Sequence, residues 1–158
     1  MGDYDVAQIC LNCHVINSSS ISFPRFNKKF CNRCGSPTIT ECPSCKTSIR
    51  GRYKDSLGVS AFPAPSYCDN CGKPYPWISS AIEAARELTK ELDSLDKEEK
   101  ETLTKSIDEI VIETPKTKLE ALKFKKLMLK VGKEAAELFK STLASIVSET
   151  AKKIIWGQ

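Results

Sequence analysis

Four pairs of cysteines are the residues of this chain best suited to chemistry. All eight cysteines fall in C-x-x-C pairs, which are Cys10/Cys13, Cys31/Cys34, Cys42/Cys45 and Cys68/Cys71. Such a turn directs two thiolates at one ion, and a tetrahedral zinc ion needs two turns of this kind. Four pairs with no cysteine left over therefore predict two zinc ions.

The residues around the pairs indicate which pairs share an ion. The second and fourth pairs resemble each other, as KFCNRCGSP and SYCDNCGKP, whereas the first and third lack the glycine that follows the second cysteine. This alternation favours two consecutive zinc ribbons. The predicted ligand sets are Cys10, Cys13, Cys31 and Cys34 for one ion, and Cys42, Cys45, Cys68 and Cys71 for the other. A cross-braced arrangement, with pairs one and three on one ion, is the alternative.

The first pair also reads C-L-N-C-H, the attachment signal for a c-type haem. Haem attachment follows export, and the N-terminus has no apolar signal segment, so we expect zinc and a cytoplasmic location. His14 is the only histidine of the chain. It is either a residue beside the site or a substitute ligand in place of Cys13.

Enzymatic chemistry finds little support in the sequence. The cysteine pairs lie in strand-poor Gly/Pro/Ser-rich sequence rather than in a βαβ unit, which argues against dithiol redox catalysis. No glycine-rich phosphate loop, nucleophile elbow or acid/base pair is evident, so we expect a protein that is not an enzyme. No apolar run is long enough to cross a membrane.

Basic and aromatic residues are interleaved in the cysteine-rich half. The chain of 158 residues has a net charge of +4, and the excess lies in residues 1–78. The residues concerned are Arg25, Lys28, Lys29, Arg33, Arg50, Arg52 and Lys54 with Phe23, Phe26, Phe30 and Tyr53. Such a mixture forms single-strand nucleic-acid surfaces. We favour the alternative that the aromatics fill the small core and that the cations balance the thiolates.

The composition changes to helix-forming residues after Pro76, so we expect residues 1–78 to hold the ribbons and 79–158 to hold three to four helices. A capping box at Ser80 predicts a helix to about Leu92, and a second helix is expected over 96–111. An apolar series then runs through Ala121, Phe124, Met128, Val131, Ala135 and Leu138, and continues with Phe139, Leu143, Ile146, Val147, Ile154 and Ile155. It predicts one long amphipathic helix over 116–155, or two that meet at Gly132.

This amphipathic region predicts an interaction. The rest of the chain is too small to cover so long an apolar face, so we expect residues 116–155 to bind a protein partner or a second copy of the chain. The lysine-rich stretch KTKLEALKFKKLMLKVGK could instead lie on an acidic membrane surface, which is the weaker interpretation. In the ribbon loop, Leu57, Val59 and Phe62 either form an exposed patch or cover the core.

Several segments, CLNCHVINSSS, FNKKFCNRCG, TECPSCKTSIRG and YCDNCGKPYPW, followed by ETPKTKLEALKFKKL, resemble a bacterial family known as domain of unknown function 2321. The resemblance covers nearly the whole chain. It implies a double zinc ribbon followed by helices and offers no established activity. In that family the position of Cys13 is often glycine and the histidine is retained, which implies Cys10 and His14 as the common ligands.

Together these patterns predict a small zinc-stabilised β region followed by an all-α region, α+β overall. The functional prediction is a zinc-binding adaptor or scaffold that acts through protein–protein interaction. A nucleic-acid-binding zinc-ribbon protein is the main alternative.

Overall fold

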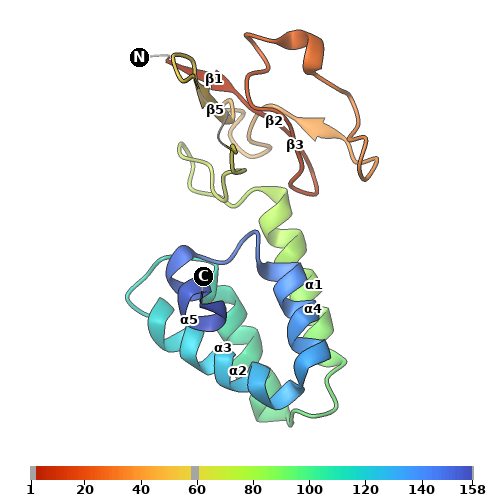
Figure 1. Ribbon diagram of the computed structural model, residues 1–158, viewed down its shortest axis with the longest axis vertical. Helices are drawn as coiled ribbons and strands as arrows, with labels where there is room; N and C mark the ends of the chain where they lie inside the picture. Colours follow the sequence, from red (N-terminus) through yellow and green to blue (C-terminus); the bar gives the residue numbers. More distant parts are fainter. Residues whose placement is uncertain (1–2, 58–60, 158) are drawn as a thin grey trace. The chain divides into compact units, whose positions relative to one another are not determined.

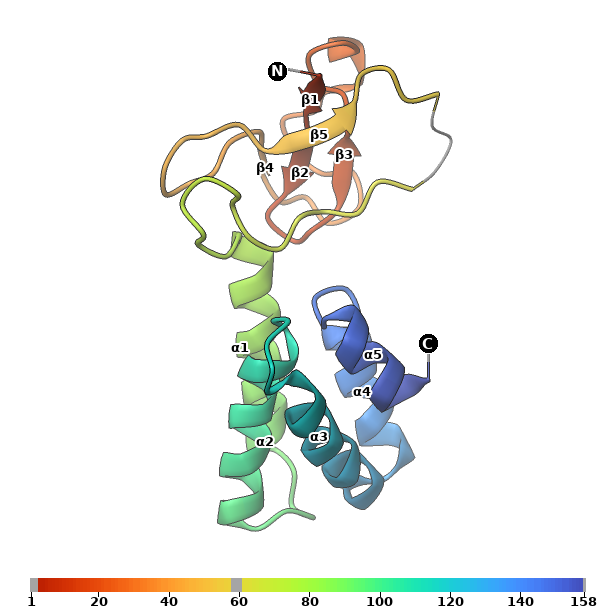
Figure 2. The ribbon, with the colours of Figure 1, turned by 90° about the vertical axis from the view of Figure 1, so that its left-hand side faces the viewer.

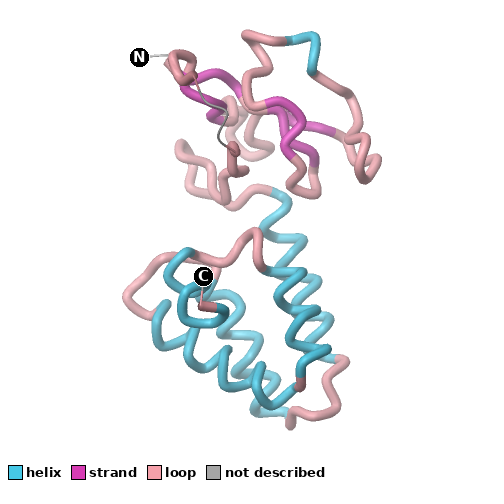
Figure 3. The backbone as a smooth tube through the Cα atoms, in the orientation of Figure 1, coloured by secondary structure: helices cyan, strands magenta, loops and turns pink. Residues whose placement is uncertain are grey.

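The computed structural model describes residues 3–57 and 61–157 of the chain. The chain divides into two compact units, Met1–Ser79 and Ser80–Gln158. The first contains short strands and many loops, and the second is helical (Figures 1 and 3). The predicted fold class, α+β with a small β region followed by helices, is confirmed.

Two small antiparallel sheets form the first unit. In one sheet β1 (Tyr4–Val6) pairs with β5 (Arg50–Tyr53), and in the other β2 (Gln8–Cys10) lies between β3 (Val15–Asn17) and β4 (Thr38–Ile39). A single 3-10 turn, η1 (Pro24–Phe26), interrupts the loop after β3. Strands of two to four residues bury little apolar surface, so this unit needs another source of stability.

The apolar core of the first unit is correspondingly small, and Ala7, Ile9 and Ile49 are fully buried in it. The chain crosses itself closely at Gly51, in β5. A Cβ atom there would lie 2.4 Å from the carbonyl oxygen of Ser18 and 2.8 Å from the carbonyl carbon of Val6. Only glycine fits this crossing, which holds β5 close beside Ser18.

Five α-helices follow in the part of the chain that the structure describes. They are α1 (Pro76–Lys90), α2 (Lys97–Ile110), α3 (Thr117–Val131), α4 (Lys133–Leu143) and α5 (Glu149–Trp156). Helix α1 begins at Pro76 and not at the predicted capping box of Ser80, because proline is well suited to the first helical position. Helix α2 begins as predicted, with Asp96 and Glu99 forming a capping box.

The long apolar series of residues 116–155 is broken at Gly132, whose φ of 93° no other residue type adopts easily. Helix α3 therefore ends there and packs against α2, α4 and α5 (Figure 2). The break also resets which residues face inward. Of two neighbours in the predicted apolar series, Leu138 is 55 % exposed, whereas Phe139 is buried against Phe124.

Two further predictions concern exposed apolar segments. Within the described parts of the chain, no helix is long and apolar enough to cross a membrane. In the loop after β5, Leu57 is fully exposed and Phe62 is half-buried. Val59, the third residue predicted for that patch, lies outside the described residues.

Candidate metal centres

Two clusters of metal-binding side chains lie in the first unit. One consists of Cys10, His14, Cys31 and Cys34, and the other of Cys42, Cys45, Cys68 and Cys71. Within each cluster the four donor atoms, one per residue, all lie within 4.8 Å of one another. The clusters follow the sequential pairing of the cysteine motifs and not the cross-braced one.

The spacing of the donor atoms fits a tetrahedral ion. Zinc–sulfur bonds of about 2.3 Å and zinc–nitrogen bonds of about 2.0–2.1 Å require separations of about 3.8 Å between sulfurs and about 3.6 Å between sulfur and nitrogen. The observed Sγ–Sγ distances are 3.7 Å for Cys10/Cys34, 3.8 Å for Cys42/Cys71 and 3.6 Å for Cys45/Cys68. These are far longer than a disulfide bond, so each cluster could hold one metal ion.

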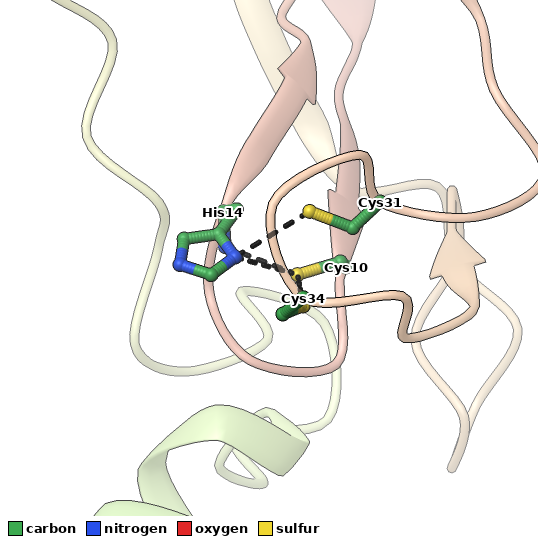
Figure 4. Close-up of side chains that lie close together, drawn as sticks. All are labelled: Cys10, His14, Cys31 and Cys34. Carbon is green, nitrogen blue, oxygen red and sulfur yellow. Dashed lines mark hydrogen bonds between the residues drawn. The ribbon is translucent and has the colours of Figure 1, made fainter.

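His14 completes the first cluster. Its Nδ1 atom lies 3.4 Å from Cys10 Sγ and 3.5 Å from Cys31 Sγ, and Figure 4 shows the ring edge directed at the three cysteines. Cys13, the predicted fourth ligand, is not among the atoms that converge there. The arrangement present is thus the alternative in which His14 stands in place of Cys13.

The backbone of the other three cysteine pairs explains this exchange. In each of them the residue after the second cysteine has a positive φ, namely Gly35 (72°), Lys46 (64°) and Gly72 (74°). The N–H of that residue donates to the carbonyl of the first cysteine, and the first cysteine N–H donates to the carbonyl five residues on. A bridge then pairs the residues that flank the turn, Phe30 with Pro37, Glu41 with Ser48 and Tyr67 with Pro74.

The turn between β2 and β3 is one residue shorter. The Cys10 N–H donates to the carbonyl of His14, four residues on, and Ile9 pairs with Val15. The residue with positive φ is now Cys13 itself, at 74°. A three-residue hairpin loop that closes with a left-handed residue has this form. Cys13 therefore occupies the place that glycine holds in the second and fourth pairs, and the next residue, His14, becomes the ligand.

The structure brings seven of the eight predicted cysteines into the clusters. The prediction that includes Cys13 assumes the same turn in all four C-x-x-C pairs. The missing glycine and aromatic residue do not distinguish the first pair, because the third pair lacks them too and still forms the longer turn. The sequence feature found only in the first pair is a histidine directly after the second cysteine.

Backbone or side-chain amide groups donate hydrogen bonds to sulfurs in both clusters. The N–H of His14 donates to Cys10 Sγ at 3.3 Å, and the N–H of Arg33 donates to Cys31 Sγ at 3.4 Å. In the second cluster the Asn70 side-chain amide donates to Cys45 Sγ at 3.5 Å. Such donors stabilise negative charge on sulfur, so they favour the thiolate form that a metal ion requires.

The thiols of each cluster differ in how easily they ionise. The Ser36 backbone N–H and the Asn12 side chain lower the pKa of Cys34 to about 5, and burial raises the pKa of Cys10. In the second cluster, hydrogen bonds from Thr47 and Asn70 lower the pKa of Cys45 to about 6.

The opposite shift occurs at Cys71. The Lys73 backbone N–H lowers its pKa, but burial and hydrogen bonding to the three neighbouring cysteines outweigh this and raise the pKa to about 11. Once one thiol has ionised, its neighbours resist adding further negative charge. A divalent cation removes that conflict, which is the electrostatic reason for expecting metal at these clusters.

Comparison with known proteins assigns the chain to a family without a known activity. The family described as "Uncharacterized protein conserved in bacteria (DUF2321)" matches residues 3–155. No curated protein and no solved structure matches the chain. Because the match covers nearly the whole length, the chain belongs to this bacterial family.

Proposed function

We propose that the protein is a non-enzymatic, zinc-binding adaptor. The observation that carries this proposal is that each cluster offers four protein donors. Four-coordinate sites made of cysteine and histidine are typical of structural zinc, whereas catalytic zinc keeps one position open for water or substrate. Thiolates and an imidazole in tetrahedral spacing favour zinc over the harder divalent ions.

Zinc would supply the stability that the first unit lacks. Its strands are two to four residues long and its apolar core is small. A structural zinc ion contributes folding free energy outright, because the unfolded chain has no preformed site. A reducing compartment such as the cytoplasm keeps the thiols available for the metal.

The adaptor role rests on apolar side chains that the helical unit leaves uncovered. Leu119, Leu122 and Leu129 of α3 are 55 %, 49 % and 78 % exposed. Leu122 and Leu129 are seven residues apart and so share one face of the helix. Covering a leucine fully stabilises a complex by about 1.5–3 kcal/mol, which favours a protein partner or a second copy of the chain.

The test is the molar mass of the zinc-loaded protein in solution, measured by light scattering over a range of concentrations. We expect a discrete oligomer, or a complex with a protein partner, that the double variant Leu122→Glu/Leu129→Glu abolishes. Lys126→Glu, on the same exposed side of α3, is the matched control for added negative charge. A monomer at every concentration that also captures no partner through these leucines would refute the adaptor proposal.

Exposed aromatics of the first unit favour a second candidate, nucleic-acid binding. Phe23, Phe26 and Phe30, predicted to fill the core, are 52 %, 52 % and 60 % exposed, so that prediction is wrong.

The third interpretation, attachment to an anionic membrane through the lysines of α3, has no comparable support, since Lys123 and Lys130 are ion-paired with Glu120 and Glu99.

A further inference from the structure

The loop of residues 21–30 presents an unusual surface. All ten residues are exposed, and they include Ile21 and the three phenylalanines of the sequence FPRFNKKF. Large apolar side chains that cluster on a surface mark binding sites more often than chance. The question is whether this loop is held in one conformation, because a binding surface gains affinity from being preorganised.

Buried polar side chains hold the loop from beneath. Asp5 is 3 % exposed, and its two oxygens accept hydrogen bonds from the N–H groups of Val6, Ile21 and Ser22 and from the Ser22 hydroxyl. These four donors fill the lone pairs of the carboxylate. Although burial raises the pKa of Asp5, the hydrogen bonds outweigh it and leave the pKa lowered, so the carboxylate is ionised and fully engaged.

Two more buried side chains fix the middle and the end of the loop. The Asn17 amide donates to the carbonyl of Phe23 at 2.9 Å and to Asn27 Oδ1 at 2.7 Å. The Gln8 side chain donates to the carbonyl of Lys28 at 2.9 Å and accepts from its N–H at 3.0 Å. In a unit with so small a core, three buried polar groups are thus committed to supporting exposed phenylalanines.

A cavity of about 340 Å³ lies beside this loop. Phe23 and Phe26 form part of its lining, together with Tyr53, Arg52 and Lys54 from the segment that Gly51 brings next to Ser18. The rest of the polar lining consists of four serines (Ser18, Ser19, Ser22 and Ser56), Asn17 and Asp5, whose carboxylate is already engaged by its four hydrogen bonds. The cavity therefore combines aromatic faces with cationic and hydroxyl groups, and its volume lies at the lower end for small-ligand sites.

Apart from the buried Asp5 carboxylate, the chain segment that carries the loop has only positive charges. No aspartate or glutamate occurs between Asp5 and Glu41, whereas this stretch contains Arg25, Lys28, Lys29 and Arg33. All four cations are exposed. A surface with aromatic faces and several cations is complementary to a polyanion whose bases are free to stack.

We propose that this surface, the Phe23/Phe26 cavity together with Arg25, Lys28 and Lys29, binds single-stranded nucleic acid. One base would enter the cavity against the phenylalanine rings, and the phosphates on either side would contact the cations. This inference rests on the proposed zinc-stabilised first unit but not on the helical interface.

The interleaving of charge and aromatic side chains favours a nucleic acid over a membrane. Insertion into lipid needs an apolar tip with the charges behind it. Here the Arg25 guanidinium lies over the Phe26 ring, 4.8 Å from its centre, so burying that ring in hydrocarbon would carry the charge with it. A single strand instead contacts rings and cations alternately along its length.

The experiment measures the fluorescence anisotropy of a labelled twenty-nucleotide oligothymidylate as zinc-loaded full-length protein is added. We expect binding that weakens about twentyfold between about 0.05 and 0.2 M salt if three phosphates are contacted. Replacing Phe23 and Phe26 together by alanine should weaken it at least about tenfold, and tyrosine at both positions should restore most of the affinity. Leu138→Ala, at an exposed apolar residue of α4 outside both proposed surfaces, is the matched control and should change nothing.

Three outcomes would overturn the proposal. The first is equal affinity for a duplex of the same length, together with no effect of the phenylalanine variants. The second is no binding of the oligonucleotide at low salt. The third is binding only to phosphatidylcholine vesicles that contain phosphatidylserine. Zinc content is measured on every variant. If the alanine double variant loses both binding and zinc, the variant with tyrosine at Phe23 and Phe26 decides. If that variant keeps its full zinc content but does not bind the oligonucleotide with most of the wild-type affinity, stacking is refuted as well. The light-scattering test of the helical interface stands apart from all of these outcomes.

Discussion

Exchanging Cys13 for glycine separates the two ways of completing the first metal centre. If Cys13 were a ligand, the substitution would remove one of four donors. In the structure Cys13 instead holds the left-handed position of the shortened turn, at a φ of 74°, and the donor set includes His14. We therefore predict that Cys13→Gly keeps two zinc ions per chain and makes the first unit more stable.

The size of the gain follows from the backbone. A non-glycine residue in the left-handed region costs roughly 1–2 kcal/mol. Replacing Cys13 by glycine removes this cost, but glycine has greater conformational freedom in the unfolded chain, which offsets about 0.5–1 kcal/mol of the gain. The net expectation is about 0.5–1 kcal/mol, or a rise of about 2–8 °C in the unfolding midpoint for a unit of this size.

The assay combines elemental zinc analysis of protein purified without chelator with thermal unfolding in the presence of zinc. Lys46→Gly is the matched control, because Lys46 has a φ of 64° at the corresponding place in the third turn and carries no candidate donor. It should raise stability by a similar amount at unchanged zinc content. His14→Ala should reduce the zinc content toward one ion per chain.

The reverse result would refute this reasoning. If Cys13→Gly loses one zinc ion while His14→Ala retains both, Cys13 is the ligand and the shortened turn does not describe the metal-loaded protein. If Cys13→Gly keeps both ions but lowers stability, the left-handed conformation is not the source of strain.

Three more predictions test other parts of the structure. A strong chelator should abolish the near-ultraviolet signal of the first unit but leave most of the helical signal at 222 nm, since the helical unit has its own core around Phe124 and Phe139; parallel loss of both signals would contradict this. Gly51→Ala should destabilise the protein by about 1–3 kcal/mol because its Cβ would meet backbone atoms, and an unchanged denaturation midpoint would disprove the close crossing. Hydrogen bonds from the Thr150 hydroxyl and N–H lower the pKa of Glu113, so its stabilising effect exists above the unfolded pKa and is lost as pH falls through the folded one. Glu113→Gln should therefore unfold in less denaturant than the wild type at pH 7, and the gap should close below about pH 4; a gap independent of pH would reject the assignment.

The sequence alone was sufficient for the features that depend on local chemistry. Eight cysteines in four pairs, with similar contexts in alternate pairs, indicated two clusters and their sequential order. The start of α2 was equally readable, since Asp96 and Glu99 satisfy backbone groups within one turn. Such features involve residues a few positions apart, so the sequence contains all the information they need.

Three other features were decided by the tertiary structure. Cys13 and His14 are adjacent and both can bind metal, and only the length of the hairpin turn, set by the pairing of Ile9 with Val15, determines which one faces the other cysteines. Leu138 and Phe139 are both apolar, and the positive φ of Gly132 decides which is buried. The apolar pattern of the sequence includes both residues and does not decide between them.

The phenylalanines of the 21–30 loop show the same limit most clearly. The interleaving of phenylalanines with basic residues in the sequence was compatible both with a core and with a binding surface. What holds them outside is a set of hydrogen bonds between the loop and the side chains of Asp5, Gln8 and Asn17. Several of these bonds join residues that are 10 to 20 positions apart along the chain. Residue types determined which metal chemistry and which helices this protein can form. Chain crossings and turn lengths, which depend on contacts between distant residues, decided which side chains face the metal, the core and the solvent.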